Sequence, residues 1–217
     1  MLQLLRTRLQ QGLRTTTFPA GAAELPTRFR GRPGGGDAGA CLFSPEEATY
    51  TGDYRMATTT REALRTTDGE IELAHALEDR VRRVLGRSLR LRSVVAGSCG
   101  GCEAELVALG NVVFDLGRFG VQFVASPRHA DGIVVTGAVN TNMTAALKKT
   151  YEAVPDPKIV IAVGACAIAG GPFRGSPEVA GGVGELLPVD LWVPGCPPHP
   201  YTLLDGLLRL LGVLEST

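Results

Sequence analysis

The sequence predicts an α/β fold: an open, doubly wound parallel sheet of the flavodoxin-like kind, preceded by an irregular N-terminal extension. Two observations support this fold class. From residue 89 onward, short segments rich in Val and Ile alternate with stretches of helical character, as in a parallel sheet covered by helices. Residues 15–68 are instead rich in Gly, Pro and Ala and show no convincing helix or strand. We therefore expect an extension, residues 1–68, and a sheet domain, residues 69–217.

The expected elements of the sheet domain follow one another in a regular order. The predicted strands, most of them apolar on both faces, are residues 89–96, 121–125, 132–136, 158–163 and 189–193. The predicted helices among and after them are residues 102–117, 140–153 and 201–213. A further helix is expected at residues 69–87, because apolar residues recur there at roughly helical spacing with charged residues on the other face.

The N-terminal extension has two parts. Leucines and arginines dominate residues 2–14, which predicts a short basic amphipathic helix. Such a helix either packs on its own protein or docks on a partner subunit or a membrane surface. The Gly/Pro-rich segment that follows is of a kind that wraps over a partner or stays disordered. We expect the whole extension to serve in docking.

Composition excludes several classes of protein. Lysine and arginine together number 22, as do aspartate and glutamate, so no net field favours nucleic acid. There is no apolar run of about 18 residues that would predict a membrane span, and the first residues lack the features of a signal peptide. Five cysteines in a chain of this length indicate a reducing compartment. We expect a cytoplasmic protein that can sit on a membrane complex.

Four of the five cysteines follow predicted strands in loops rich in glycine or proline. Cys99 and Cys102 lie in GSCGGC after the first of these strands, Cys166 lies in GACAIAGG after the fourth, and Cys196 lies in VPGCPPHP after the fifth. In an open parallel sheet, ligands bind outside the carboxyl ends of the strands. We therefore expect three separate segments to bring four thiols to the same edge of the sheet.

Four thiolates in this arrangement suit either a four-cysteine zinc site or a [4Fe–4S] cluster. Structural zinc sites usually use two close cysteine pairs, whereas here one C-x-x-C pair is followed by two isolated cysteines far along the chain, which favours a cluster. A redox dithiol would use Cys99 and Cys102 but would leave Cys166 and Cys196 unexplained. Four cysteines that merely pack are the remaining alternative.

Four stretches of the sequence resemble one family of proteins. GSCGGCEAEL, RFGVQFVASPRHADGIVVTGAVNTNM, VGACAIAGGPF and VPGCPPHP, in this order, resemble the small, cluster-bearing subunit of [NiFe] hydrogenases, most closely the membrane-bound group 4 enzymes of the formate hydrogenlyase type. The same motifs occur in the homologous subunit that carries cluster N2 in complex I. The resemblance covers about residues 89–213 and implies a flavodoxin-like domain.

Two details of the motifs place the sequence nearer the hydrogenases than complex I. The complex I subunit has two adjacent cysteines where this chain has the spaced pair Cys99 and Cys102, and it tends to carry arginine after G-C-P-P, where this chain has His199. The periplasmic uptake hydrogenases have a twin-arginine signal and many more cysteines, and the sequence shows neither. We therefore expect a single proximal cluster.

The resemblance implies an electron-transfer role. The expected ligands of one [4Fe–4S] cluster are Cys99, Cys102, Cys166 and Cys196. The catalytic [NiFe] centre would lie in a separate large subunit, so this oxidoreductase subunit would relay electrons between it and a ferredoxin-like iron–sulfur subunit. Membrane ion-translocating subunits would hold the complex on the inner face of the cell membrane. The alternatives are a complex I-like quinone oxidoreductase, a hydrogenase-related complex without nickel, and a stand-alone zinc-stabilised binding module.

Other residues are assigned roles by the resemblance or by position. Glu105 stands where the family carries an acidic residue beside the active-site interface, which suggests proton movement; the alternative is a carboxylate favoured by the N-terminal dipole of its helix. Arg128 and His129 are expected to fix a loop or the subunit interface. His199 is expected either to hydrogen-bond near the cluster or to pack in its proline loop.

The extension also shows a resemblance. FPAGAAELPTRFRGRP is similar to the entry segment of the polyferredoxin-like subunit of the same complexes, but the cysteine-rich body that follows there is missing, and only Cys41 is left. We interpret the extension either as a degenerate remnant kept for docking or as an unrelated addition. Cys41 is expected to be no ligand of the cluster.

Overall fold

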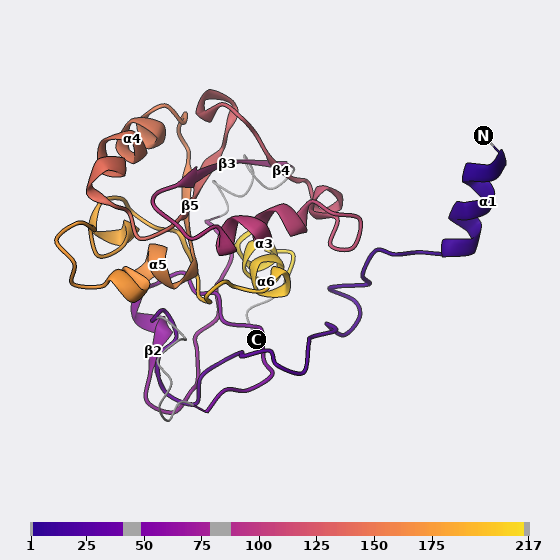
Figure 1. Ribbon diagram of the computed structural model, residues 1–217, viewed down its shortest axis with the longest axis horizontal. Helices are drawn as coiled ribbons and strands as arrows, with labels where there is room; N and C mark the ends of the chain where they lie inside the picture. The colour runs from indigo at the N-terminus through magenta and orange to yellow at the C-terminus, as the bar shows by residue number, and fades with distance from the viewer. Residues whose placement is uncertain (1, 41–48, 79–87, 215–217) are drawn as a thin grey trace.

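The computed structural model describes residues 2–40, 49–78 and 88–214, and it confirms the predicted fold class (Figure 1). Five strands form one parallel sheet in the order β4-β3-β5-β6-β7, which is the strand order of flavodoxin-like folds. The strands are β3 (Leu89–Val95), β4 (Val121–Phe123), β5 (Gly132–Thr136), β6 (Ile159–Val163) and β7 (Leu191–Val193). All residues of the inner strands β5 and β6 are buried, as expected for strands covered on both faces, and so are those of the outer strand β7.

Helices cover both faces of the sheet. Those of the sheet domain are α3 (Gly101–Leu109), α4 (Thr141–Glu152), α5 (Gly164–Ala169) and α6 (Pro200–Leu210). Leu106 of α3 and Leu203 of α6 belong to the core on one face, whereas Leu147 of α4 and Ile168 of α5 belong to the core on the other. In Figure 1, α3 and α6 accordingly lie together and apart from α4 and α5.

The strand register aligns the ends from which the site loops leave. Val95 of β3 pairs with Thr136 of β5, which pairs with Val163 of β6, which in turn pairs with Val193 of β7. These four residues form one row across the sheet at its carboxyl edge. The segments that follow β3, β6 and β7 therefore leave the sheet at the same level, and the cysteines they carry start from neighbouring positions.

The second half of the extension packs over the sheet domain instead of standing apart from it. It contains two-residue strands β1 (Gly36–Asp37) and β2 (Arg65–Thr66), paired antiparallel, and a short 3₁₀ turn, Glu62–Leu64. Thr58 and Trp192 exchange backbone hydrogen bonds of 3.0 and 2.8 Å, so the extension pairs with the outer strand β7. Met56 and Leu64 are buried in the core beside α4 and α5.

Packing of the extension explains why every residue of α6 is buried. Phe18 and Tyr54 of the extension pack against Tyr201, with ring centroids 5.4 and 5.9 Å away. Ala57 lies against Gly206, where an added Cβ would come within 2.6 Å of the alanine methyl group. Helix α6 packs on one face of the sheet, and the extension in turn covers α6.

Two expectations about helices were wrong, and one further helix was not expected. Residues 69–78 form no helix; they run extended, with Ile71 and Leu73 buried in the core, so tertiary burial overrides the apparent helical spacing, and residues 79–87 lie outside the described residues. The helix expected at 102–117 ends at Leu109, because the side chain of Asn111 accepts hydrogen bonds from the two backbone amides of Val113 and Phe114 and forms a turn. The six-residue α5 was not predicted, since it is too short to show a period.

Candidate metal centre

Four cysteines line one cavity at the carboxyl edge of the sheet. Its volume is about 130 Å³. The cysteines are Cys99, Cys102, Cys166 and Cys196, and the other lining residues are Ser98, Gly101, Gly137, Ala165, Gly195 and Pro197. The structure therefore brings together all four of the cysteines that the sequence singled out. Cys41 lies outside the described residues.

Each cysteine is positioned by a different local structure. Cys99 lies in the loop between β3 and α3 and is exposed, whereas Cys102 lies in the first turn of α3 and is buried. Cys166 lies in α5 and Cys196 in the turn between β7 and α6, and both are partly buried. The cavity is thus enclosed on the side of the sheet and is nearest to solvent at Cys99.

Two glycines make room for the sulfur atoms. Gly164, at φ +87°, follows β6 directly, and a Cβ there would lie 2.5 Å from the Sγ atom of Cys102. Gly171, at φ +53°, follows α5, and a Cβ there would lie 2.7 Å from the Sγ atom of Cys166. Only glycine tolerates both the left-handed backbone and the close approach of sulfur at these two positions.

The electrostatics of the cavity disfavour uncompensated thiolates. Burial, followed by the negative charges of Glu103 and of the other three cysteines, raises the pKa of Cys102 to about 12. At neutral pH this thiol keeps its proton unless a cation binds in its place. A metal centre supplies that positive charge, and its binding releases the thiol protons.

Glu103 is a site residue that was not predicted from the sequence. It follows Cys102 on α3 and accepts a hydrogen bond of 2.6 Å from the hydroxyl of Ser98 and a second from the hydroxyl of Thr136, the last residue of β5. Burial by itself would raise the pKa of Glu103, but these two hydrogen bonds, together with one from a backbone amide, outweigh it and leave the pKa below its ordinary value. Ser98 and Glu103 flank the cysteine pair in the sequence, which is a local signal for their contact. Thr136 is distant in the sequence, and only the fold brings it to Glu103.

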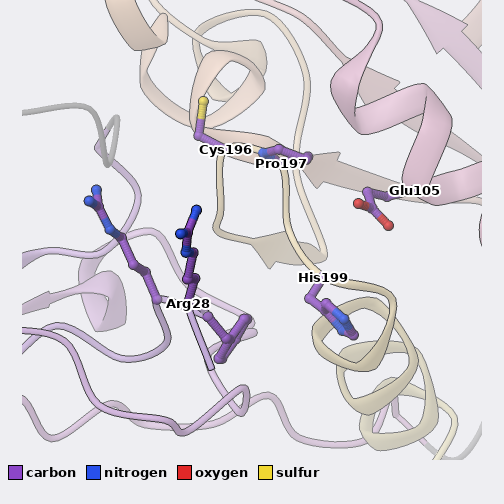
Figure 2. A pocket seen from close by; sticks show the side chains of 7 residues that line it. Arg28, Glu105, Cys196, Pro197 and His199 are labelled. Carbon is purple, nitrogen blue, oxygen red and sulfur yellow. The ribbon is translucent and has the colours of Figure 1, made fainter. Parts of the chain in front are cut away.

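Glu105 lines a second cavity, of about 270 Å³, next to the first (Figure 2). The remaining lining residues are Arg28, Phe29, Arg30, Cys196, Pro197 and His199. Figure 2 shows Glu105 and His199 on one side, Arg28 of the extension on the other, and the Cys196–Pro197 turn between them. Burial raises the pKa of Glu105 above its ordinary value. The extension and the cysteine loop thus share the walls of this cavity.

The predicted histidine and arginine residues fall in different places. His199 caps α6: its Nδ1 atom accepts a hydrogen bond of 3.2 Å from the backbone amide of Tyr201, and its ring stacks on that of Tyr201. Burial lowers its pKa, so the neutral ring that this bond requires is favoured. Arg128 and His129 lie exposed in a 3₁₀ turn, Pro127–His129, and line neither cavity.

Two other kinds of feature are absent from the described residues. Within residues 2–40, 49–78 and 88–214, no three His, Cys, Asp or Glu side chains converge closely enough to hold a single metal ion. Over the same part of the chain, no helix has the length and apolar character needed to cross a membrane.

Comparison with known proteins identifies relatives of this chain. It is 44% identical over 143 residues to a probable membrane-bound hydrogenase subunit, mbhJ, of Pyrococcus furiosus, a match that covers 64% of this chain and 86% of the relative. It is 44% identical over 130 residues to formate hydrogenlyase subunit 7 of Escherichia coli, and 47% identical over 116 residues to an NADH-quinone oxidoreductase subunit of Bacteroides thetaiotaomicron. These two matches cover 60% and 53% of this chain but only 51% and 58% of the relatives.

A solved structure and a family model agree with these relatives. A chain from the structure of the membrane-bound sulfane sulfur reductase, described as an archaeal respiratory membrane complex, matches with a TM-score of 0.54 and 33% identity, covering 63% of this chain and 76% of that one. The family model matches residues 99–210, which run from the first site cysteine to the end of α6. The chain therefore belongs to the family of the 20 kDa subunit of NADH:ubiquinone oxidoreductase, together with subunits of membrane-bound hydrogenase and formate hydrogenlyase.

Proposed function

We propose that this chain is the electron-transfer subunit of a membrane-associated [NiFe] hydrogenase-type complex and carries one proximal [4Fe–4S] cluster. The observation that carries the proposal is the single cavity lined by Cys99, Cys102, Cys166 and Cys196. Four thiols from three separate segments face the same space at the edge of the sheet where parallel α/β folds bind their ligands. An oxidoreductase subunit with this site moves electrons and leaves the bond-forming chemistry to a partner.

The cavity fits a cluster in two respects. A [4Fe–4S] cluster is held by four cysteine thiolates, which is the number and type of ligand present. A void that holds one water molecule needs about 10–15 Å³ of probe-occupied volume, so a cavity of about 130 Å³ is roughly ten times larger than that.

The residues of the chain hold the cluster and adjust its environment. Cys102 lies in the first turn of α3, where the positive end of the helix dipole partly offsets the burial that disfavours its thiolate. Glu103 adds a negative charge beside the ligands, and Pro197 removes one backbone amide that could donate to sulfur. When bound, the cluster supplies one-electron transfer, and its potential depends on such charges, hydrogen bonds and burial.

The partners are proposed from the names of the relatives. Subunits of a membrane-bound hydrogenase and of formate hydrogenlyase are each 44% identical to this chain, which supports a large subunit with a [NiFe] centre as one neighbour. There the reaction 2H⁺ + 2e⁻ ⇌ H₂ would take place, with the electrons passing through this chain to a ferredoxin-like iron–sulfur subunit. Membrane subunits that translocate ions would place the chain on the inner face of the cell membrane. Glu105, in the cavity beside Cys196, would move protons at the large-subunit interface.

Two alternatives have support of their own. Identity to a subunit of NADH-quinone oxidoreductase is 47%, so a complex I-like enzyme that reduces a quinone is one of them. The matching chain from a sulfane sulfur reductase complex supports the other, a hydrogenase-related complex without nickel. The three functions share the cluster and differ in the large subunit. Nickel content and hydrogen evolution, measured on the complex purified with this chain, distinguish the hydrogenase from both alternatives, and quinone reduction distinguishes the first alternative from the second.

Metal analysis of the chain itself tests the cluster. We expect about four iron and four sulfide per chain, with an EPR signal on reduction, whereas a zinc-stabilised module would contain one zinc and neither iron nor sulfide. Cys196→Ser should lose iron, and Cys41→Ser, the matched control, should keep it in full. Full iron in Cys196→Ser together with loss in Cys41→Ser would refute the ligand assignment.

A further inference from the structure

The N-terminal helix is not part of the folded body. α1, Leu2–Gln11, has ten residues and buries none of them, and Figure 1 shows it well apart from the rest of the chain. The side chains of Leu2, Leu5 and Leu9 are exposed by 86%, 58% and 84%. A helix this short is marginal in water by itself. It therefore needs a surface that the described part of the chain does not provide.

The helix has one apolar face with positive charge beside it. Leu2, Leu5 and Leu9 are three and four residues apart, so they share one side of the helix. Arg6 and Arg8 flank this strip on either side, and glutamine and threonine occupy much of the opposite side. This is the pattern of a helix that lies in an interface, with its apolar side down and basic side chains at the boundary.

Charge indicates what kind of surface the helix fits. From Met1 to Ala23 the sequence has three arginines and no aspartate or glutamate, although the chain as a whole has 22 basic and 22 acidic residues. Positive charge is therefore concentrated around the exposed leucines. An anionic phospholipid surface is complementary to this end of the chain, because its headgroups pair with the arginines while the leucines enter the acyl boundary.

The link from α1 to the body is short. Gly12, which follows the last residue of the helix, has φ +66°. Four residues later, the amide of Thr16 donates a hydrogen bond of 2.8 Å to the carbonyl of Val113, and the guanidinium of Arg118 donates to the carbonyls of Thr16 and Phe18 at 2.7 and 2.6 Å. The chain that follows α1 is therefore fixed to the loop after α3, and α3 begins at the cysteine site. A surface that binds α1 would lie near this loop.

We propose that α1 is an interfacial membrane anchor, which lies on an anionic phospholipid surface and attaches this chain to it directly. Ten residues of helix rise about 15 Å, half of the roughly 30 Å of hydrocarbon in a bilayer, so the helix lies on the membrane and does not span it. The proposal concerns residues outside the cluster site and does not depend on which reaction the complex catalyses.

Vesicle flotation of the full-length protein tests the proposal. The probes are vesicles of equal parts phosphatidylglycerol and phosphatidylcholine, and vesicles of phosphatidylcholine alone. We expect binding to the anionic vesicles that weakens at high salt, and little binding to the neutral ones. Leu9→Gln should weaken binding about tenfold, since one buried leucine is lost from the interface. Arg6→Gln with Arg8→Gln should weaken binding and reduce its dependence on salt.

Leu4→Gln is the matched control, because it makes the same chemical change off the strip of Leu2, Leu5 and Leu9. It should weaken binding much less than Leu9→Gln. None of these variants should alter the iron content or circular dichroism of the protein, since α1 buries no residue. Equal losses for Leu4→Gln and Leu9→Gln, or no binding of the wild-type chain to anionic vesicles, would overturn the proposal. A protein partner or a second copy would then be the occupant, detected as complex or dimer lost in Leu9→Gln.

Discussion

Thr136, the last residue of β5, donates a hydrogen bond to Glu103 in the first turn of α3. The contact joins the centre of the sheet to the helix that carries Cys102, and the second oxygen of the same carboxylate accepts from Ser98, which precedes Cys99. One side chain therefore ties together the strand edge and the loop of the first two cysteines. Its negative charge is fixed beside the cavity.

Removal of this charge should raise the reduction potential of the cluster. Reduction adds an electron, so a neighbouring carboxylate disfavours the reduced form, and Glu103→Gln should make reduction easier. A lost interaction of about 1.4 kcal/mol corresponds to about 59 mV for one electron. An EPR-monitored redox titration measures the shift. Glu185→Gln, which removes an exposed carboxylate from another loop, should leave the potential unchanged. An unchanged potential in Glu103→Gln would contradict the prediction.

Gly164→Ala should reduce the iron content of the protein. The new methyl group would lie 2.5 Å from the sulfur of Cys102, and the positive φ adds backbone strain of roughly 1–3 kcal/mol. Gly175→Ala is the control, because Gly175 has a similar φ of +83° and no atom within 4 Å of an added Cβ. The Gly175→Ala variant should have the same backbone strain but keep its full iron content. Equal iron content in the two variants would show that contact with Cys102 is unimportant.

Glu105→Gln should stabilise the folded chain at neutral pH. Burial raises the pKa of Glu105 in the folded state, so this state releases its proton at a higher pH than the unfolded chain does. Folding is therefore penalised as pH rises from the unfolded to the folded pKa, and the penalty persists above both. The gain in melting temperature should be present at pH 7 and vanish below the unfolded pKa of about 4.3. Glu178→Gln, at an exposed position, serves as the control.

The same variant tests the proton role in the assembled complex. If Glu105 moves protons beside the cysteine loop, turnover should fall and the pH profile should change, although the iron content stays full. Unchanged turnover and pH profile in Glu105→Gln would leave this residue only its effect on stability.

Leu64→Ala should show that the extension is part of the fold. Leu64 is fully buried in the core beside α4 and α5, so its truncation should lower the free energy of unfolding by about 2–5 kcal/mol. Leu13→Ala, at a position exposed by 98%, should change it by less than about 0.5 kcal/mol. Urea unfolding followed by circular dichroism measures both. A small effect of Leu64→Ala would mean that the sheet domain is stable without this segment.

The parallel sheet could be predicted from the sequence because its inner strands are buried on both faces. Segments such as IVIAV of β6 are then apolar throughout, and a parallel arrangement with helices between the strands brings Cys99, Cys166 and Cys196 to one edge. The strands could therefore be predicted from their apolar residues, and the meeting of the cysteines from the rule that parallel sheets bind ligands at the carboxyl ends of their strands.

Contacts between distant segments could not be predicted in this way. Residues 69–87 carry apolar residues at roughly helical spacing, and only the core that Ile71 and Leu73 enter beside α4 decides in favour of an extended chain over residues 69–78. Glu103 of α3 has a partner, Thr136, that lies 33 residues further along the chain on β5, so no local spacing shows that the two meet. Arg28 lines the cavity of Glu105 because the extension packs against the sheet domain, and no local pattern in the sequence shows this packing.

The pairing of Thr58 with Trp192 also has a consequence for association between molecules. An outer strand with unpaired backbone groups is a template for another chain, and proteins cover or shorten such strands. Here the extension occupies β7, while the opposite outer strand, β4, has only three residues. Polymerisation of this chain through the edges of its sheet is thus discouraged at both sides.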